Sequence, residues 1–89
     1  MLTPIYLRLF KKDLDQSIKR NKDISKLKNI ITDLCQGLTL PVKNRNHKLR
    51  GNYEGFWECH IEPDWLLIYK KTETEIILAR LGTHSDLFE

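Results

Sequence analysis

The chain has 89 residues, 40% hydrophobic and 30% charged, with a net charge of +3, which fits one small globular domain and excludes a disordered chain. Its apolar runs stay well short of the roughly 18 residues of a membrane span, and its start lacks the charged and then apolar pattern of a secretory signal. The two cysteines, Cys35 and Cys59, do not make a disulfide framework, so we expect a reduced, cytoplasmic protein.

The first half of the chain contains a weak strand signal followed by two helical patterns. Residues 2–6 are a short apolar stretch, and Pro4 would keep such a strand at a sheet edge. Helical spacing then predicts an amphipathic helix that ends near Arg20, on the residues Leu7, Phe10, Leu14 and Ile18. A second stripe predicts a helix that Asp23 or Ser25 can cap, on the residues Ile24, Leu27, Ile30, Ile31, Leu34 and Leu38.

After Pro41 the pattern changes to that of strands. In chain order we expect a basic loop at 41–46, a possible short strand at 47–50, a turn at 51–55, and strands at 56–62, 65–69 and 76–81. Residues 65–69 are continuously apolar, as expected of a central strand that is covered on both faces. The sequence therefore predicts a single α+β domain over residues 1–89, with two N-terminal helices packed on one face of a small, mainly antiparallel twisted sheet.

The strand expected at 56–62 alternates between two kinds of side chain. Trp57, Cys59 and Ile61 point one way, towards the helices, while Glu58 and His60 point the other way. Cys59 is then a small buried hydrophobic residue, because a nucleophilic cysteine needs exposure and a neighbour that stabilises its thiolate.

The three histidines, His47, His60 and His84, all lie at expected strand ends and turns, which predicts a shared site. His60 and Asp64 flank the turn at Pro63, where the carboxylate could orient the imidazole. A metal site built from the histidines and Asp64 is disfavoured, because apart from His60 and Asp64 no two of them have ligand spacing on one element. We therefore expect no metal and no other cofactor.

Acid–base cleavage of RNA suits these residues better than metal binding. The substrate supplies its own nucleophile, the ribose 2′-hydroxyl, so the enzyme needs a base, an acid and positive charge at the phosphate. Histidine suits both proton transfers because its pKa lies near working pH, and arginine or lysine supplies the charge. Phe88 and Trp65 are available for stacking on bases, although Trp65 fits a buried strand position equally well.

Three segments carry a resemblance to a known family, at residues 47–51 (HKLRG), 60–69 (HIEPDWLLIY) and 81–88 (LGTHSDLF). Together they resemble the YafQ branch of the RelE/ParE toxin superfamily, and the resemblance extends over the whole chain. It implies a bacterial type II toxin with a RelE-like fold, a ribosome-dependent endonuclease that cuts mRNA in the A site by 2′-hydroxyl attack and leaves a 2′,3′-cyclic phosphate. The implied partners are mRNA, the ribosome and a DinJ/RelB-like antitoxin that alone contacts operator DNA; no membrane partner is implied.

The family's functional residues fall on matching positions of this chain. The implied catalytic residues are His47, His60, Asp64, His84 and Arg80, and the implied substrate-binding residues are Phe88, Trp65, Glu58 and Lys48. We expect His84 to be the general acid and His60, held by Asp64, to be the general base. His47 could share or take over the role of base, and Arg80 would stabilise the phosphorane-like transition state.

Charge distribution keeps two other functions open. Residues 1–50 carry twelve Lys and Arg against four Asp and Glu, whereas residues 51–89 carry three against eight. The basic half would bind ribosomal RNA in an interferase, but it also fits a non-catalytic nucleic-acid-binding module with incidental histidines. A toxin of the same fold that inhibits a protein such as gyrase is the third possibility, although the gyrase-directed relatives lack this set of histidines.

Overall fold

The computed structural model describes residues 1–88 and confirms the expected α+β class. Its elements are β1 (Thr3–Tyr6), α1 (Arg8–Lys19), α2 (Ile24–Cys35), η1 (Val42–Asn44), β2 (His47–Lys48), η2 (Gly51–Tyr53), β3 (Trp57–Glu62), β4 (Trp65–Lys71), β5 (Glu75–Gly82) and α3 (His84–Phe88). The short helix α3 was not expected from the sequence. Within the described part of the chain, no helix is both long enough and apolar enough to cross a membrane.

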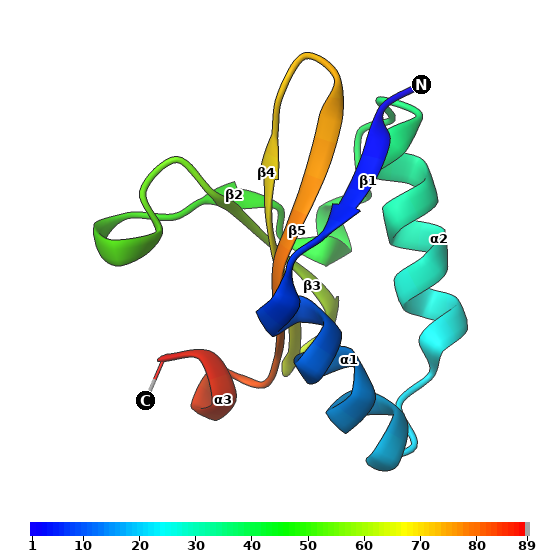
Figure 1. Cartoon of the computed structure of the whole chain (residues 1–89), viewed down its shortest axis with the longest axis vertical. Coiled ribbons are helices and arrows are strands. Elements are labelled where there is room, and N and C mark those ends of the chain that lie inside the picture. Colours follow the sequence, from blue (N-terminus) through cyan, green and yellow to red (C-terminus); the bar gives the residue numbers. More distant parts are fainter. Residues whose placement is uncertain (89) are drawn as a thin grey trace.

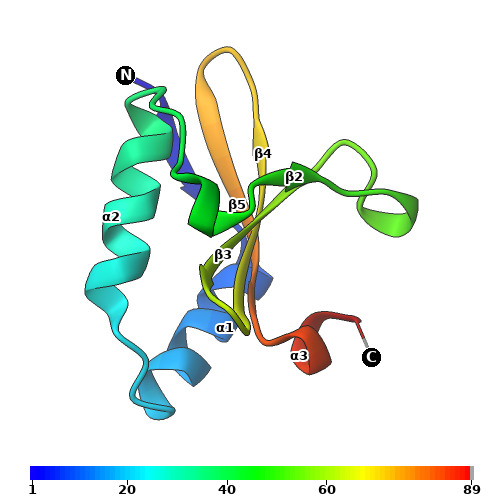
Figure 2. The same cartoon turned by 180° about the vertical axis from the view of Figure 1, so that it is seen from behind.

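The five strands form one sheet in the order β1-β5-β4-β3-β2. β1 pairs in parallel with β5 at one edge, and the other three pairings are antiparallel. An edge position suits Pro4, which cannot donate a backbone hydrogen bond to a second neighbour. The continuously apolar β4 is the central strand, as expected, and Figures 1 and 2 show it between β5 and β3 from opposite sides.

Two separate hydrophobic clusters cover the two faces of the sheet. The larger lies under α1 and α2 and includes Phe10, Leu27, Cys59, Ile61, Trp65, Leu67 and Leu78. The smaller lies on the opposite face and combines Leu66, Ile68 and Ala79 with Leu87 of α3 and with Leu49, Tyr53 and Phe56 of the loop after β2. The predicted alternation of β3 is confirmed, because Cys59 and Ile61 belong to the helix-side cluster and Glu58 and His60 point to the other face. α3 and the loop cover only part of that other face.

The two helices bury different amounts of their expected apolar stripes. α2 is capped by Asp23, whose carboxylate accepts a hydrogen bond from the Ser25 amide at 3.1 Å. In α1 only Phe10 of the expected stripe is fully buried, and Ile18 is 52% exposed. Ser17 is buried in its place because it faces the core, where its hydroxyl accepts a hydrogen bond from the Trp65 indole at 3.2 Å.

Trp65 belongs to the core, and this corrects its expected role in stacking on substrate bases. Its side chain is 1% exposed and lies on the helix side of the sheet, away from the histidines. The Trp65→Phe variant should unfold with a free energy lower by about 2 kcal/mol, because it leaves a cavity and an unpaired Ser17 hydroxyl. Urea denaturation measures this loss, and Trp57→Phe is the control because Trp57 is only partly buried. An equal or larger loss in the control would contradict the assignment of Trp65 to the core.

Candidate active site

The structure brings the three histidines together from three different elements. His47 begins β2, His60 lies on β3 and His84 begins α3. The ring centroids of His47 and His60 are 6.3 Å apart, and those of His60 and His84 are 5.7 Å apart. His60 therefore lies between the other two, in a row that one RNA linkage could contact.

The buried carboxylate of Glu58 lies close to two of these histidines, His47 and His60. Its side chain is 6% exposed, and its Oε1 atom lies 3.4 Å from His47 Nε2 and 3.5 Å from His60 Nε2. β2 pairing sets this arrangement, because it places His47 directly opposite Glu58 on β3. The second carboxylate oxygen, Oε2, is buried and has no hydrogen-bond partner among the described residues.

The hydrogen-bond network indicates where the protons of His47 and His60 lie. Nδ1 of His47 is 2.7 Å from the Arg45 carbonyl oxygen, and Nδ1 of His60 is 3.2 Å from the Pro63 carbonyl oxygen. A carbonyl oxygen only accepts, so each Nδ1 carries a hydrogen and donates it. In neutral rings, both Nε2 lone pairs would then point at one carboxylate oxygen. A proton between Glu58 and either ring relieves that repulsion, so the trio is suited to accepting and holding one proton.

His84 has a different and more exposed partner. Its Nδ1 is 2.6 Å from Asp64 Oδ1, and the same oxygen accepts the His84 backbone N–H at 2.9 Å. The backbone N–H, followed by the imidazole, lowers the pKa of Asp64 below its ordinary value. With Nδ1 engaged, Nε2 is the nitrogen left for a substrate, and an anionic Asp64 would stabilise the imidazolium form.

The expected pairing of Asp64 with His60 is therefore wrong. The turn after β3 directs His60 Nδ1 to the Pro63 carbonyl, while the Asp64 side chain reaches the first residue of α3. The sequence pattern does not indicate α3, which brings His84 closer to the Asp64 carboxylate than the histidine four positions away. Glu58 and Pro63 orient His60, and Asp64 orients His84.

Arg80 and Phe88 lie beside the histidines on the same side of the sheet. Ile68 of β4 pairs with Glu58 on one side and with Arg80 on the other, so Arg80 lies two strands away from Glu58. This spacing separates the two backbones by roughly 10 Å. Its guanidinium is held by Asp13 of α1, with Nε 2.7 Å from Oδ2. Phe88 is 48% exposed, and its ring meets the ring of Tyr53 edge-on with a centroid distance of 6.1 Å.

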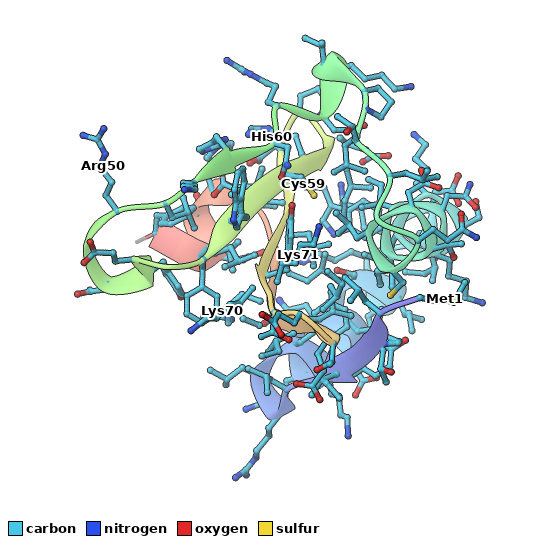
Figure 3. The ribbon with its side chains drawn as sticks, turned by 90° about the horizontal axis from the view of Figure 1, so that it is seen from above. Met1, Arg50, Cys59, His60, Lys70 and Lys71 are labelled. Carbon is cyan, nitrogen blue, oxygen red and sulfur yellow. The ribbon has the colours of Figure 1, made fainter. Side chains whose placement is uncertain are left out.

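Lys48 lies on the face opposite the histidines, which corrects its expected contact with substrate at this site. It pairs with Trp57, and its ammonium nitrogen is 5.5 Å from the centre of the Trp57 ring, which packs against the helix-side core. In contrast, Arg50 extends outward from the loop that follows β2 (Figure 3). Cys59 is fully buried, and burial raises the pKa of its thiol to about 12, so the expectation of a non-nucleophilic cysteine is confirmed.

Tyr53 was missed by the sequence reading. It lies in η2 and contacts the rings of Phe56 and Phe88, with centroid distances of 6.2 and 6.1 Å. It therefore supports Phe88 at the border of the histidine cluster. The available signal was an aromatic residue within a turn between two glycines, Gly51 and Gly55.

Comparisons with known proteins agree on one family. Residues 2–89 match the profile of a family described as a bacterial toxin of type II toxin-antitoxin system, YafQ. Over 84 residues the chain is 42% identical to the mRNA interferase toxin YafQ of Escherichia coli K12, covering 93% of this chain and 91% of that protein. The crystal structure of YafQ from E. coli BL21(DE3) is 38% identical and superimposes with a TM-score of 0.94 over the whole of both chains. A chain of the E. coli DinJ-YafQ toxin-antitoxin complex superimposes with a TM-score of 0.91 at 39% identity, covering 99% of this chain and 98% of that one.

Proposed function

The chain belongs to the YafQ family of type II toxins, and from this membership and the histidine site we propose that it is an mRNA interferase, an endoribonuclease that cuts mRNA on the ribosome. The observation that carries the proposal is the contrast between two proton-transfer groups. His47 and His60 share the buried carboxylate of Glu58, whereas His84 is paired with the exposed carboxylate of Asp64. Two such groups beside each other are what in-line cleavage of an RNA linkage requires.

In the proposed reaction the group of His47, Glu58 and His60 removes the proton from the ribose 2′-hydroxyl. The 2′-oxygen then forms a bond to the adjacent phosphorus, and the bond from phosphorus to the 5′-oxygen breaks. His84 donates the proton on Nε2 to the departing 5′-oxygen, so the products are a 2′,3′-cyclic phosphate and a free 5′-hydroxyl. Either His60 or His47 serves as the base, because both face Glu58 in the same way.

Positive charge and aromatic surface complete the proposed site. Arg80 would stabilise the negative charge that develops on the phosphorane oxygens, with its orientation set by Asp13. Phe88, supported by Tyr53, would stack on a base next to the cleaved linkage. Glu58 acts through the two histidines and would not touch the RNA, because its side chain is buried beneath them.

An open site supports the proposed dependence on the ribosome. The side chains of His84 and Asp64 are 54% and 64% exposed, so the chain does not enclose an RNA strand by itself. A ribosome would hold the mRNA codon in the A site and present its backbone to the histidines. The lysines of the basic N-terminal half would then bind ribosomal RNA, through counterion release.

The proposed protein partner is an antitoxin of the DinJ/RelB type. The E. coli relative has been crystallised as a DinJ-YafQ toxin-antitoxin complex, and this chain shares 39% identity with the toxin over nearly its whole length. We extend that partnership to this chain, with operator DNA contacted through the antitoxin alone.

The deciding experiment incubates a defined mRNA with the purified chain, with and without translating ribosomes, and maps the new RNA ends. We expect cuts in phase with codons only when ribosomes are present, with 2′,3′-cyclic phosphate at the upstream ends. Cleavage of free RNA at the same rate would contradict the dependence on the ribosome. DNA damage after expression, without codon-phased cuts, would instead support a toxin that inhibits gyrase.

A further inference from the structure

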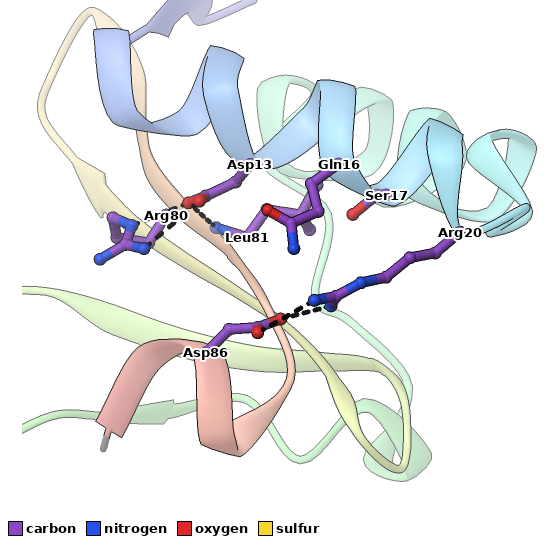
Figure 4. A pocket seen from close by; sticks show the side chains of 7 residues that line it. All are labelled: Asp13, Gln16, Ser17, Arg20, Arg80, Leu81 and Asp86. Atoms are coloured by element: carbon purple, nitrogen blue, oxygen red, sulfur yellow. Dashed lines mark hydrogen bonds and ion pairs between the residues drawn. The ribbon is translucent and has the colours of Figure 1, made fainter.

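Two ion pairs connect helix α1 to the segment that carries Arg80 and His84, and Figure 4 shows both of them. Asp13 of α1 pairs with Arg80 of β5, with atom distances of 2.7 and 3.3 Å. Arg20, directly after α1, pairs with Asp86 of α3, with distances of 2.7 and 3.3 Å. Asp13 and Arg20 are seven positions apart, about two helical turns, so both point from one face of α1.

Asp13 fixes both the side chain of Arg80 and the strand that carries it. β1 pairs with β5 only as far as Leu78, so within residues 1–88 no strand lies beside the remainder of that edge. The Asp13 carboxylate accepts the Leu81 backbone N–H at 3.0 Å as well as two hydrogen bonds from Arg80. Asp13 thus takes the place of a missing strand partner and sets the direction of the guanidinium in one contact.

Arg20 reaches α3 at the end that carries His84. Asp86 accepts the Thr83 backbone N–H at 3.0 Å, and the Thr83 hydroxyl accepts the Asp86 N–H at 3.1 Å, so Asp86 is fixed to the start of the helix. The Arg20 guanidinium, together with the Thr83 amide, lowers the pKa of Asp86 to about 2. Gly82 completes the contact, because a Cβ atom there would lie 2.9 Å from the Asp86 side chain.

A helix as short as α3 depends on such outside contacts. It spans only His84–Phe88, and helices of this length are unstable in isolation. Its other supports are Asp64, which accepts the His84 backbone N–H at 2.9 Å, the buried Leu87, and the ring contact between Phe88 and Tyr53. Asp64 ties the His84 end of α3 to the turn between β3 and β4, and Arg20 ties the same end to the helical layer through Asp86.

We propose that Asp13 and Arg20 are positioning residues, through which α1 holds Arg80 and His84 at a fixed distance from each other. Neither residue would touch the RNA, since each acts through its ion-pair partner. The catalytic consequence rests on the proposed ribonuclease function, whereas the structural consequence does not depend on it. Correct spacing matters because His84 must reach the leaving oxygen of the same phosphate that Arg80 stabilises.

The experiment compares Arg20→Gln with Lys19→Gln, which removes the same charge from the neighbouring exposed residue at the end of α1. Hydrogen exchange measured by NMR should be roughly two- to five-fold faster at the amides of His84 and Leu87 in Arg20→Gln, because a partly exposed ion pair contributes modestly to local stability. The amide of Ile68 in β4 should keep its wild-type exchange rate. Lys19→Gln should leave all three amides unchanged.

Activity adds a readout that a purely structural contact would not change. On ribosomes, Arg20→Gln should lower kcat about five- to ten-fold and leave KM within about two-fold, because the lost contact misplaces His84 and removes no substrate contact. Arg20→Lys should recover part of kcat by restoring the charge. Asp13→Asn should act in the same way, through Arg80.

The possible outcomes distinguish a failure of the positioning role of Arg20 from a failure of the proposed ribonuclease function. Unchanged exchange at His84 in Arg20→Gln, or an equal change in Lys19→Gln, would overturn the positioning role whether or not the chain cleaves RNA. Faster exchange at His84 with wild-type kcat would confirm the contact and overturn its catalytic consequence. Faster exchange in a chain whose wild-type form leaves mRNA intact on ribosomes would reject the proposed function and retain the anchoring of α3.

Discussion

The His84→Ala variant should fold like the wild-type chain and cleave mRNA on ribosomes about 10³-fold more slowly, within the range that a lost proton transfer costs. The reason is the departing 5′-oxygen, which would leave without a proton. The loss of stability should be small, because the side chains of His84 and its partner Asp64 are both more than half exposed. Single-turnover appearance of 5′-hydroxyl ends measures the rate, and thermal unfolding measures the stability.

Ser85→Ala is the matched control for His84→Ala, because it alters a neighbouring exposed side chain of the same helix. It should retain the wild-type rate and the growth arrest on expression, both of which His84→Ala should lose. Growth arrest undiminished in His84→Ala would remove the basis for an acid–base mechanism.

A modified substrate identifies which proton transfer His84 performs. An mRNA with sulfur in place of the 5′-bridging oxygen at the cleaved linkage has a leaving group that needs no proton. If His84 is the general acid, this substrate should restore most of the rate of His84→Ala, whereas a general base would still be needed to activate the 2′-hydroxyl. Failure of the sulfur substrate to restore that rate would assign His84 to another role.

Features of the site that depend on neighbouring residues in the sequence could be predicted, whereas those that depend on contacts between distant segments could not. Period-two alternation places Glu58 and His60 on one face of β3 and Cys59 on the other, because the faces of a strand follow from sequence alone. No such alternation could place Lys48, since β2 is only two residues long and its register is set by pairing with β3. A two-residue strand has no periodicity that a sequence pattern can report.

The sequence could not show which side chains form hydrogen bonds and ion pairs with one another. Asp64 lies four positions from His60 but twenty from His84, and it binds the more distant histidine because α3 presents both a backbone N–H and an imidazole to it. Asp13 resembles an ordinary solvent-facing charge of an amphipathic helix, yet it supports Arg80 across the sheet edge. Such pairings are decided by tertiary packing, which brings together groups whose sequence separation carries no information about distance.

The Glu58→Gln variant should retain its stability and lose about 10²-fold in the rate of cleavage on ribosomes. Glutamine has the same shape as glutamate, and its NH₂ group can donate hydrogen bonds to the Nε2 atoms of His47 and His60, which the carboxylate oxygen cannot do. Both rings would then be fixed as neutral imidazoles with their lone pairs engaged, and neither could accept the proton of the 2′-hydroxyl. The free energy of unfolding should stay equal or rise, because the substitution removes a buried charge and leaves a neutral amide oxygen at the position of the unpaired Oε2.

Glu62→Gln provides the control, since it makes the same change on the same strand at a carboxylate that pairs with Lys22 and Lys26. It should cost less than about 1 kcal/mol of stability and leave the rate of cleavage unchanged. The sulfur substrate sharpens the comparison, because it should not restore Glu58→Gln, in which the missing step precedes departure of the leaving group. A wild-type rate in Glu58→Gln would mean that the general base does not depend on the Glu58 carboxylate, and would overturn the proposed group of His47, Glu58 and His60.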